Sequence, residues 1–194
     1  MTAARTGAIV LAGGRSSRFG TDKLEASVDG RRLLEHSIDA ARSAASTVVV
    51  VLAPGAARTL PADVVVAHDA EAYEGPLAGL VAGLDAMPAD IERVIVVGGD
   101  MPSLSVPVLA LLIDALGEAS DHAAAVLDEG GPMPMAVRVS VARPVALDLL
   151  AAGERRLRAL PERLEAAIVP GARWRVLDHD AATLRDIDRP ADLG

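Results

Sequence analysis

Short apolar runs rich in β-branched residues alternate along the chain with longer stretches in which apolar residues recur every three or four positions. Runs of the first kind predict buried strands at residues 7–11, 47–52, 63–67, 93–97, 123–127, 135–139 and 175–177. Stretches of the second kind predict helices at residues 33–45, 77–87, 105–116, 141–152 and 154–166. This alternation is typical of an α/β fold, a Rossmann-like three-layer sandwich with a mostly parallel central sheet.

Particular residues mark where the elements begin and end. Pro76 lies where the first turn of a helix tolerates proline, and Ser105 is a suitable N-cap for the helix that follows it. The pair Pro54-Gly55 ends the second predicted strand. These signals agree with the hydrophobic pattern.

Composition limits the class of protein. The 194 residues can form a core that needs no covalent staples, and we expect residues 1–194 to form a single domain. The absence of cysteine excludes disulfides, thiolate metal sites and a cysteine nucleophile, and it suits a reducing compartment. The apolar runs are shorter than the roughly 20 residues of a membrane span, and the N-terminal residues do not resemble a secretory signal. We therefore expect a cytoplasmic protein with no membrane partner.

The net charge of the chain limits the classes of ligand that we expect it to bind. The formal net charge is −8, and an acidic chain does not attract a polyphosphate backbone, which argues against nucleic acid as a partner. A few local cations or a metal ion can still hold a small phosphorylated ligand.

The loop after the first predicted strand reverses this negative charge locally. It reads LAGGRSSRFGTDK over residues 11–23, with Gly13 and Gly14 directly after the strand and three cations, Arg15, Arg18 and Lys23. Adjacent glycines let backbone approach a ligand closely and expose amide groups to phosphate oxygens. A surface turn with exposed basic side chains is the alternative, but strand, glycines and cations together favour a phosphate site.

Spacing separates this loop from two better-known phosphate loops. A Walker loop has Gly-Lys-Ser/Thr at its end, whereas Lys23 comes three residues after Gly20. A dinucleotide-binding fingerprint requires Gly-x-Gly-x-x-Gly, whereas Gly13 and Gly14 are adjacent. The spacing therefore excludes both of these phosphate loops.

Carboxylates follow the predicted strands at the same edge of the sheet. Asp100 comes after Gly98-Gly99 at the end of the fourth strand, where a carboxylate can reach a cation such as Mg²⁺. Asp69 ends the third strand and could hold a ribose hydroxyl or a base N–H. Either aspartate could instead be an ordinary turn residue.

Two further segments could contribute to the same site. Gly75 begins GPLAG, a tight turn at a helix start whose backbone donors could meet a base edge or a sugar. Asp186 and Asp188 lie two residues apart, so in an extended segment they face the same way, and one could complete a metal site with Asp100. A solvated acidic stretch is the alternative.

Four blocks in order, LAGGRSSRFGTDK, EGPLAGL, GGDMP and DIDRPADL, resemble the NTP-transferase superfamily, whose fold is of the nucleotide-diphospho-sugar transferase type. The segment AGERR at residues 152–156 is similar to that of molybdenum cofactor guanylyltransferases, the MobA-like branch. This resemblance implies a nucleotidyltransferase that moves GMP from GTP to molybdopterin-bound molybdenum cofactor and uses Mg²⁺. It also leaves room for contact with proteins of molybdenum cofactor biosynthesis or with acceptor proteins.

The resemblance and the local chemistry together assign roles to residues. Arg18, Lys23 and Asp100 are the expected catalytic residues, and Asp100 and Asp188 the expected Mg²⁺ ligands. Arg155 and Arg156 are candidates for an acceptor phosphate, or alternatively part of a solvated helix face. The expected nucleotide contacts come from Leu11, Ala12, Gly13, Gly14, Arg15, Lys23, Asp69, Gly75 and Asp100.

Departures from the family pattern leave donor and acceptor open. The chain has Gly99 where the family often has Cys, Met133 where it often has His, and Asp186 and Asp188 where it has Asn. A sister enzyme that uses CTP or another phosphorylated acceptor, such as phospholactate, is the nearest alternative. A module that binds nucleotide without chemistry is the alternative from another class.

Overall fold

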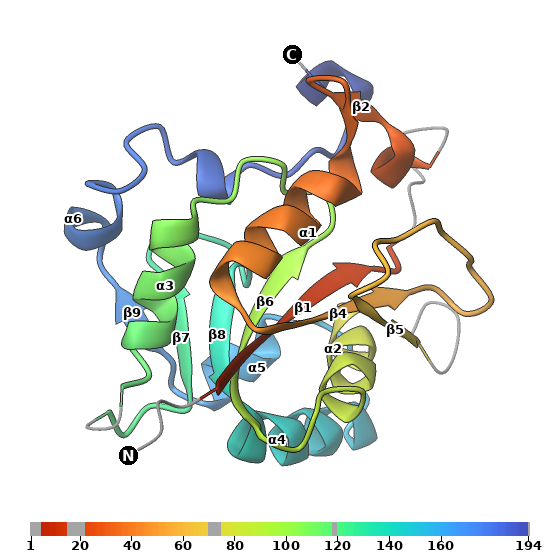
Figure 1. The fold of residues 1–194 in the computed structure, drawn as a ribbon. Coiled ribbons are helices and arrows are strands. Elements are labelled where there is room, and N and C mark those ends of the chain that lie inside the picture. Colours follow the sequence, from red (N-terminus) through yellow and green to blue (C-terminus); the bar gives the residue numbers. More distant parts are fainter. Residues whose placement is uncertain (1–4, 15–21, 70–74, 118–119, 194) are drawn as a thin grey trace.

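The computed structural model describes residues 5–14, 22–69, 75–117 and 120–193, and its centre is a seven-stranded sheet in the order β5-β4-β1-β6-β8-β7-β9 (Figure 1). Only β8 runs antiparallel to its neighbours in this sheet. The predicted mostly parallel α/β fold is therefore confirmed. The strands of the sheet are β1 (Arg5–Ala12), β4 (Thr47–Leu52), β5 (Val65–His68), β6 (Ile91–Gly98), β7 (Ala124–Leu127), β8 (Met135–Arg138) and β9 (Ala167–Val169).

Helices cover both faces of the sheet (Figure 1). One face packs against α1 (Leu33–Ala44) and α3 (Val106–Asp114), and the other against α2 (Pro76–Asp85), α4 (Val139–Ala151) and α5 (Ala159–Arg163). The shorter elements are η1 (Lys23–Glu25), the hairpin β2 (Ser27–Val28) and β3 (Arg31–Arg32), α6 (Gly171–Trp174), η2 (Ala182–Leu184) and η3 (Pro190–Leu193). Within the described ranges, no helix is long and apolar enough to cross a membrane.

Burial on both faces explains the unbroken apolar runs of the central strands. In β1, Ile9 packs on the side of α2, whereas Ala8 and Val10 pack on the side of α1. All three are fully buried. A strand covered on both faces needs apolar residues at every position, and this produces a continuous run rather than an alternating one.

Two predicted elements after residue 150 are wrong. The stretch 175–177 is not a strand but a turn after α6, in which Val176 and Leu177 are 65% and 47% exposed. The last strand is β9, which begins directly after the predicted helix 154–166 and pairs with β7, and no strand was predicted at this position. Only Ala159–Arg163 of that stretch is α-helical, because Gly153 adopts a φ of 86° and the Glu154 carboxylate accepts the backbone amides of the next two residues.

The hairpin formed by β2 and β3 was not predicted. Its two central residues, Asp29 and Gly30, both have positive φ, at 50° and 78°. An Asp-Gly pair is a strong signal for a two-residue hairpin turn, but the flanking strands are too short to show an apolar pattern. The signal was present in the sequence without the context that would have supported it.

The C-terminal segment returns to the edge of the sheet where β1 and β6 end. Ser105 is the N-cap residue of α3, as predicted, but its side chain makes no capping bond. Its backbone N–H instead donates to the buried hydroxyl of Thr183 at 2.9 Å. Farther along, the Ile187 N–H donates to the carbonyl of Asp100 at 3.0 Å. These bonds bring Asp186 and Asp188 beside the end of β6.

Candidate active site

A cavity of about 390 Å³ lies at the C-terminal ends of β1, β4 and β6. The chain passes from β1 outward to β4 and later returns to β6 on the other side of β1, which makes this edge a topological switch point. Ala12 does not line the cavity, since it is 4% exposed and packs in the core on the side of α1. The predicted site residues that do line it are Leu11, Gly13, Gly14, Asp69, Gly75 and Asp100.

Asp69 follows β5 directly and lines this cavity. Its backbone N–H donates to the carbonyl of Leu52 at 3.0 Å, which continues the pairing of β5 with β4 by one residue. A Cβ atom at Gly79 would lie 3.4 Å from Asp69 Oδ2, and one at Gly13 would lie 3.5 Å from it. The two glycines therefore leave space around a carboxylate that faces the ligand volume.

Lys23 lies between two carboxylates from distant parts of the chain. Its Nζ atom is 2.6 Å from Asp100 Oδ2 and 2.8 Å from Asp188 Oδ1. The side chain of Lys23 is 13% exposed, that of Asp100 is 21% exposed and that of Asp188 is 45% exposed. The structure thus brings together three of the predicted site residues at the rim of the cavity.

The electrostatics of this cluster keep Lys23 charged. Burial lowers the pKa of the Lys23 ammonium, but hydrogen bonds and charges from Asp100 and Asp188 outweigh it and raise the pKa above its ordinary value. Partial desolvation, together with the negative charges of Asp188 and Asp100, raises the pKa of Asp186. Two carboxylates contact the ammonium and a third, Asp186, interacts with it electrostatically, so the cluster has an excess of negative charge.

The sequence contains one lysine among its 19 basic residues, and that lysine is Lys23. An ammonium is a compact charge on a flexible stem, whereas a guanidinium is a wide planar group. At this position the smaller group fits between Asp100 and Asp188.

The residues present fit a divalent cation. Asp100 and Asp188 direct carboxylate oxygens at one point, now taken by the Lys23 ammonium. Mg²⁺ is commonly held by one or two carboxylates and completed by waters and substrate phosphates. Within the described part of the chain there is no group of three or more His, Cys, Asp or Glu side chains placed to hold a metal ion. A metal here would therefore need further oxygens from a ligand or from water.

The GPLAG turn is fixed by contact with the AGERR segment. Gly75 has a φ of 90°, and a Cβ atom there would lie 2.7 Å from the carbonyl oxygen of Arg155, so glycine is required. The Leu77 N–H donates to that same carbonyl at 3.4 Å, and the Ala78 N–H donates to the Gly75 carbonyl. The expectation that the donors at this helix start meet the ligand is therefore not met for these two amides.

Arg155 and Arg156 lie on a neighbouring cavity of about 340 Å³. This second cavity shares Gly75, Pro76 and Met133 with the first. Arg155 Nη1 donates to the Leu150 carbonyl at 2.9 Å. The two cavities therefore meet at one wall, with the nucleotide loops on one side and the arginines on the other.

Glu154 holds the AGERR turn together. Its carboxylate accepts the backbone amides of Arg155 and Arg156 at 2.8 Å each, and it forms an ion pair with the Arg156 guanidinium at 2.6 Å. The Arg156 guanidinium, followed by these two amides, lowers the pKa of Glu154 to about 2. The turn therefore stays folded while its arginines face solvent.

Two of the predicted site residues, Arg15 and Arg18, lie outside the described residues. The sequence analysis missed Ala53 and Met133, which line the first cavity. Ala53 follows β4 at the edge where the other strands contribute ligand contacts, and that position could have identified it. Met133 comes from a loop that only the fold brings to this edge.

Comparison with known proteins places the chain in a family. Residues 8–167 match the MobA-like NTP transferase domain. A probable molybdenum cofactor guanylyltransferase from Deinococcus radiodurans is 36% identical over 188 residues, which cover 96% of this chain and 91% of that protein.

Solved structures share the fold. A molybdopterin-guanine dinucleotide biosynthesis protein A from Archaeoglobus fulgidus superposes with a TM-score of 0.78 at 23% identity, over 96% of this chain and 94% of that one. A Mycobacterium tuberculosis protein solved in complex with manganese superposes with a TM-score of 0.62 at 21% identity, over 86% and 88%. At these identities the structures establish the fold, and the sequence match establishes the family: the chain belongs to the MobA-like NTP transferases.

Proposed function

We propose that this protein transfers GMP from GTP to the phosphate of a molybdopterin-bound molybdenum cofactor and releases pyrophosphate. The observation that carries the proposal is the cluster of Lys23, Asp100 and Asp188 at the rim of a cavity lined by the Gly13-Gly14 loop. The choice of donor and acceptor is supported by the 36% identity to a protein named as a probable molybdenum cofactor guanylyltransferase.

The reaction is an in-line displacement at the α-phosphorus of GTP. An oxygen of the acceptor phosphate forms the new P–O bond, and the bond to the bridging oxygen breaks, so that pyrophosphate leaves with the electron pair. The acceptor phosphate is already ionised at neutral pH, so the step needs no general base. Catalysis then depends on positioning and on neutralising the charge that develops on the phosphates.

The residues of this chain supply both effects. The backbone at Gly13 and Gly14 can approach the triphosphate closely, and Asp69 can accept a hydrogen bond from the ribose or the base. Lys23 would leave its aspartates and place its ammonium against a phosphate. The ordinary pKa of a lysine ammonium lies far above neutral pH, so Lys23 remains protonated when it moves to a phosphate.

Asp100 and Asp188 are the residues that would then hold a divalent cation. When bound, such a cation supplies positive charge that offsets the charge on the α-phosphate and on the leaving pyrophosphate. We propose Mg²⁺ as this cation, and the structural relative solved with manganese supports a divalent ion of this type. On the other side of the shared wall, Arg155 and Arg156 would bind the acceptor phosphate.

The test is pyrophosphate release measured with each of GTP, CTP, ATP and UTP, with molybdopterin-bound molybdate as acceptor and Mg²⁺ or Mn²⁺ present. We expect release with GTP alone, a dinucleotide product detectable by mass spectrometry, and no release in the presence of a chelator. Release with CTP alone would reassign the donor. Tight nucleotide binding without release at any acceptor concentration would contradict the proposal and favour a binding module.

A further inference from the structure

We propose that Arg58 is a positioning residue that holds the turn carrying Lys23 and so directs its ammonium at Asp100 and Asp188. Arg58 belongs to the segment 53–64 that joins β4 to β5, and it touches neither of these aspartates. The catalytic consequence of its position rests on the proposed function, whereas the geometry does not.

The guanidinium of Arg58 contacts the residues on both sides of Lys23 in a single 3₁₀ turn. Nη2 pairs with the carboxylate of Asp22, and Nη1 donates to Glu25 Oε1 at 2.7 Å. Asp22 is the N-cap of this turn, where its other oxygen accepts the Leu24 N–H at 3.2 Å. One side chain therefore fixes the residue before Lys23 and the residue two positions after it.

Packing adds a third constraint to the turn. Leu24 is 5% exposed and inserts into the core on the side of α1. With Leu24 buried and both flanking carboxylates held by Arg58, Lys23 has one direction left, toward the end of β6. The geometry thus explains why Lys23, which follows the glycine-rich loop, points inward.

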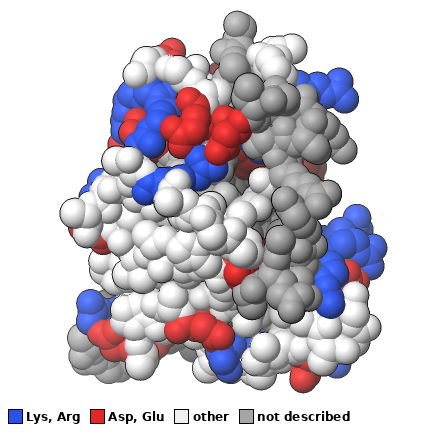
Figure 2. Space-filling model, turned by 90° about the vertical axis from the view of Figure 1, so that its right-hand side faces the viewer, with Lys and Arg blue, Asp and Glu red and all other residues white. Residues whose placement is uncertain are grey.

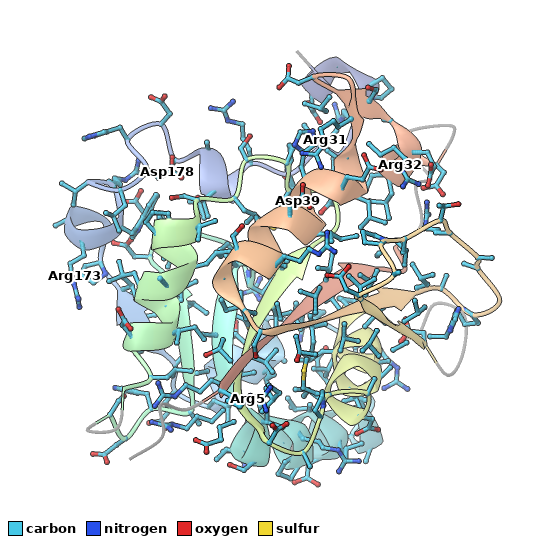
Figure 3. The ribbon with its side chains drawn as sticks, in the orientation of Figure 1. Arg5, Arg31, Arg32, Asp39, Arg173 and Asp178 are labelled. Atoms are coloured by element: carbon cyan, nitrogen blue, oxygen red, sulfur yellow. The ribbon has the colours of Figure 1, made fainter. Side chains whose placement is uncertain are left out.

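A second arginine strengthens this arrangement. Arg32 Nη2 donates to the carbonyl of Thr59 at 2.9 Å, and Arg32 Nη1 lies 3.5 Å from Glu25 Oε2. Figure 3 shows Arg32 at the start of α1, beside the segment that joins β4 to β5. On the face that includes this segment, basic and acidic side chains lie intermixed in the upper part (Figure 2).

The burial of Arg58 distinguishes it from an ordinary surface cation. Its side chain is 12% exposed, and its Nε atom is buried without a hydrogen-bond partner within the described residues. A guanidinium that contacts two carboxylates through separate nitrogens fixes their geometry better than a single exposed pair does. An arginine held in this way restricts the motion of the turn rather than only adding charge to it.

The chain supplies a matched control in the same segment. Arg42 on α1 pairs with Asp63, near the end of the segment 53–64, and the two side chains are 34% and 62% exposed. Loss of this pair removes one arginine contact to the same segment but leaves the turn of Lys23 untouched. Arg42→Gln is therefore the control for Arg58→Gln.

The first measurement needs no catalysis. Because Lys23 is the only lysine, an amine-directed reagent modifies this side chain and the N-terminal amine, which serves as an internal reference in mass spectrometry. In Arg58→Gln the turn loosens, and we expect Lys23 to be labelled about fivefold faster relative to the reference. Arg42→Gln should leave the ratio unchanged. Equal labelling of Lys23 in all three proteins would overturn the proposal.

The second measurement links position to activity. We expect kcat/KM for GTP to fall about ten- to a hundredfold in Arg58→Gln, to fall less in Arg58→Lys, and to stay within about twofold in Arg42→Gln. In a Lys23→Ala background, Arg58→Gln should add less than about twofold, because both changes remove the same contribution. Additive losses in this cycle would mean that Arg58 acts elsewhere.

A second variant and the behaviour of the unmodified protein distinguish a folding defect from a failure of the proposed function. If Arg58→Gln does not fold, Glu25→Gln removes one of the two Arg58 contacts and should shift the labelling ratio in the same direction by a smaller amount. If the unmodified protein transfers no nucleotide at all, the proposed function fails, and the labelling ratio still decides whether Arg58 positions Lys23.

Discussion

The two sides of the shared cavity wall are built in different ways. On the nucleotide side, Lys23 meets Asp188 across 165 residues of sequence and is 13% exposed. On the proposed acceptor side, Arg156 pairs with Glu154 two residues away and is 71% exposed. Long-range contacts fix the first set of charges before any ligand arrives, whereas the second set can turn toward an incoming anion at little cost. We infer that the first side serves catalysis and the second serves binding.

The strongest test of this difference is removal of the Asp100 carboxylate, which is proposed both to act in catalysis and to bind the divalent cation. We expect Asp100→Asn to reduce the rate of pyrophosphate release at saturating substrates by two or more orders of magnitude, because charge at the α-phosphate is no longer offset. Circular dichroism should show an unchanged fold. The control is Asp114→Asn, an exposed position on α3, which should retain activity within about twofold. Near-normal turnover by Asp100→Asn would remove the distinction between the two sides.

Gly75 lies in the wall between the two cavities, and a substitution there should disturb both of them. Gly75→Ala places a Cβ against the Arg155 carbonyl at a φ of 90°, and we expect a loss of about 1–3 kcal/mol in the free energy of unfolding, measured in urea. KM should rise for both donor and acceptor, since the turn borders both cavities.

Gly55→Ala is the control for this change. Gly55 also has a positive φ, of 70°, but the space around its missing Cβ is open. It should therefore lose only about 1 kcal/mol and leave both KM values unchanged. An equal loss in the two variants would show that backbone strain alone, and not the contact with Arg155, accounts for the effect.

The acceptor side should respond in KM rather than in kcat. We expect Arg155→Ala and Arg156→Ala each to raise KM for the acceptor about three- to tenfold, with KM for GTP unchanged, because an exposed charged contact contributes modestly to binding. Initial rates at fixed saturating GTP measure this. A rise in KM for GTP instead would place these arginines on the donor and contradict the comparison.

The smallest expected effect concerns the pH range over which Glu154 stabilises the AGERR turn. The pKa of Glu154 lies at about 2, below its ordinary value, so its contribution to stability is present above about pH 4.5 and is lost as the pH falls toward 2. Glu154→Gln should lower Tm by no more than about 2 °C at pH 6, and the difference should shrink below pH 4.5. The control is Glu162→Gln, which removes an exposed ion pair with Arg158 outside the AGERR turn.

The predictions made from the sequence were most successful for residues that directly follow the buried strands at this edge of the sheet. Buried strands identified the sheet, and the residues that follow them, such as Gly13, Asp69 and Asp100, line the cavity as placed. The sequence could not reveal that Lys23 pairs with Asp188, because that contact depends on how the C-terminal segment folds back. Arg58 was missed for the same reason, since a single arginine in a polar connection carries no local pattern.

The bond between the Ile187 N–H and the Asp100 carbonyl has a consequence for the order in which the site forms during synthesis. The glycine loop, Lys23 and Asp100 leave the ribosome before Asp188, which follows Asp100 by 88 residues. An emerging chain can therefore pair its sheet strands and bury its core while the carboxylate cluster lacks one member. Until residues 187 and 188 dock against the end of β6, a nascent protein that already resembles the folded one has an incomplete site.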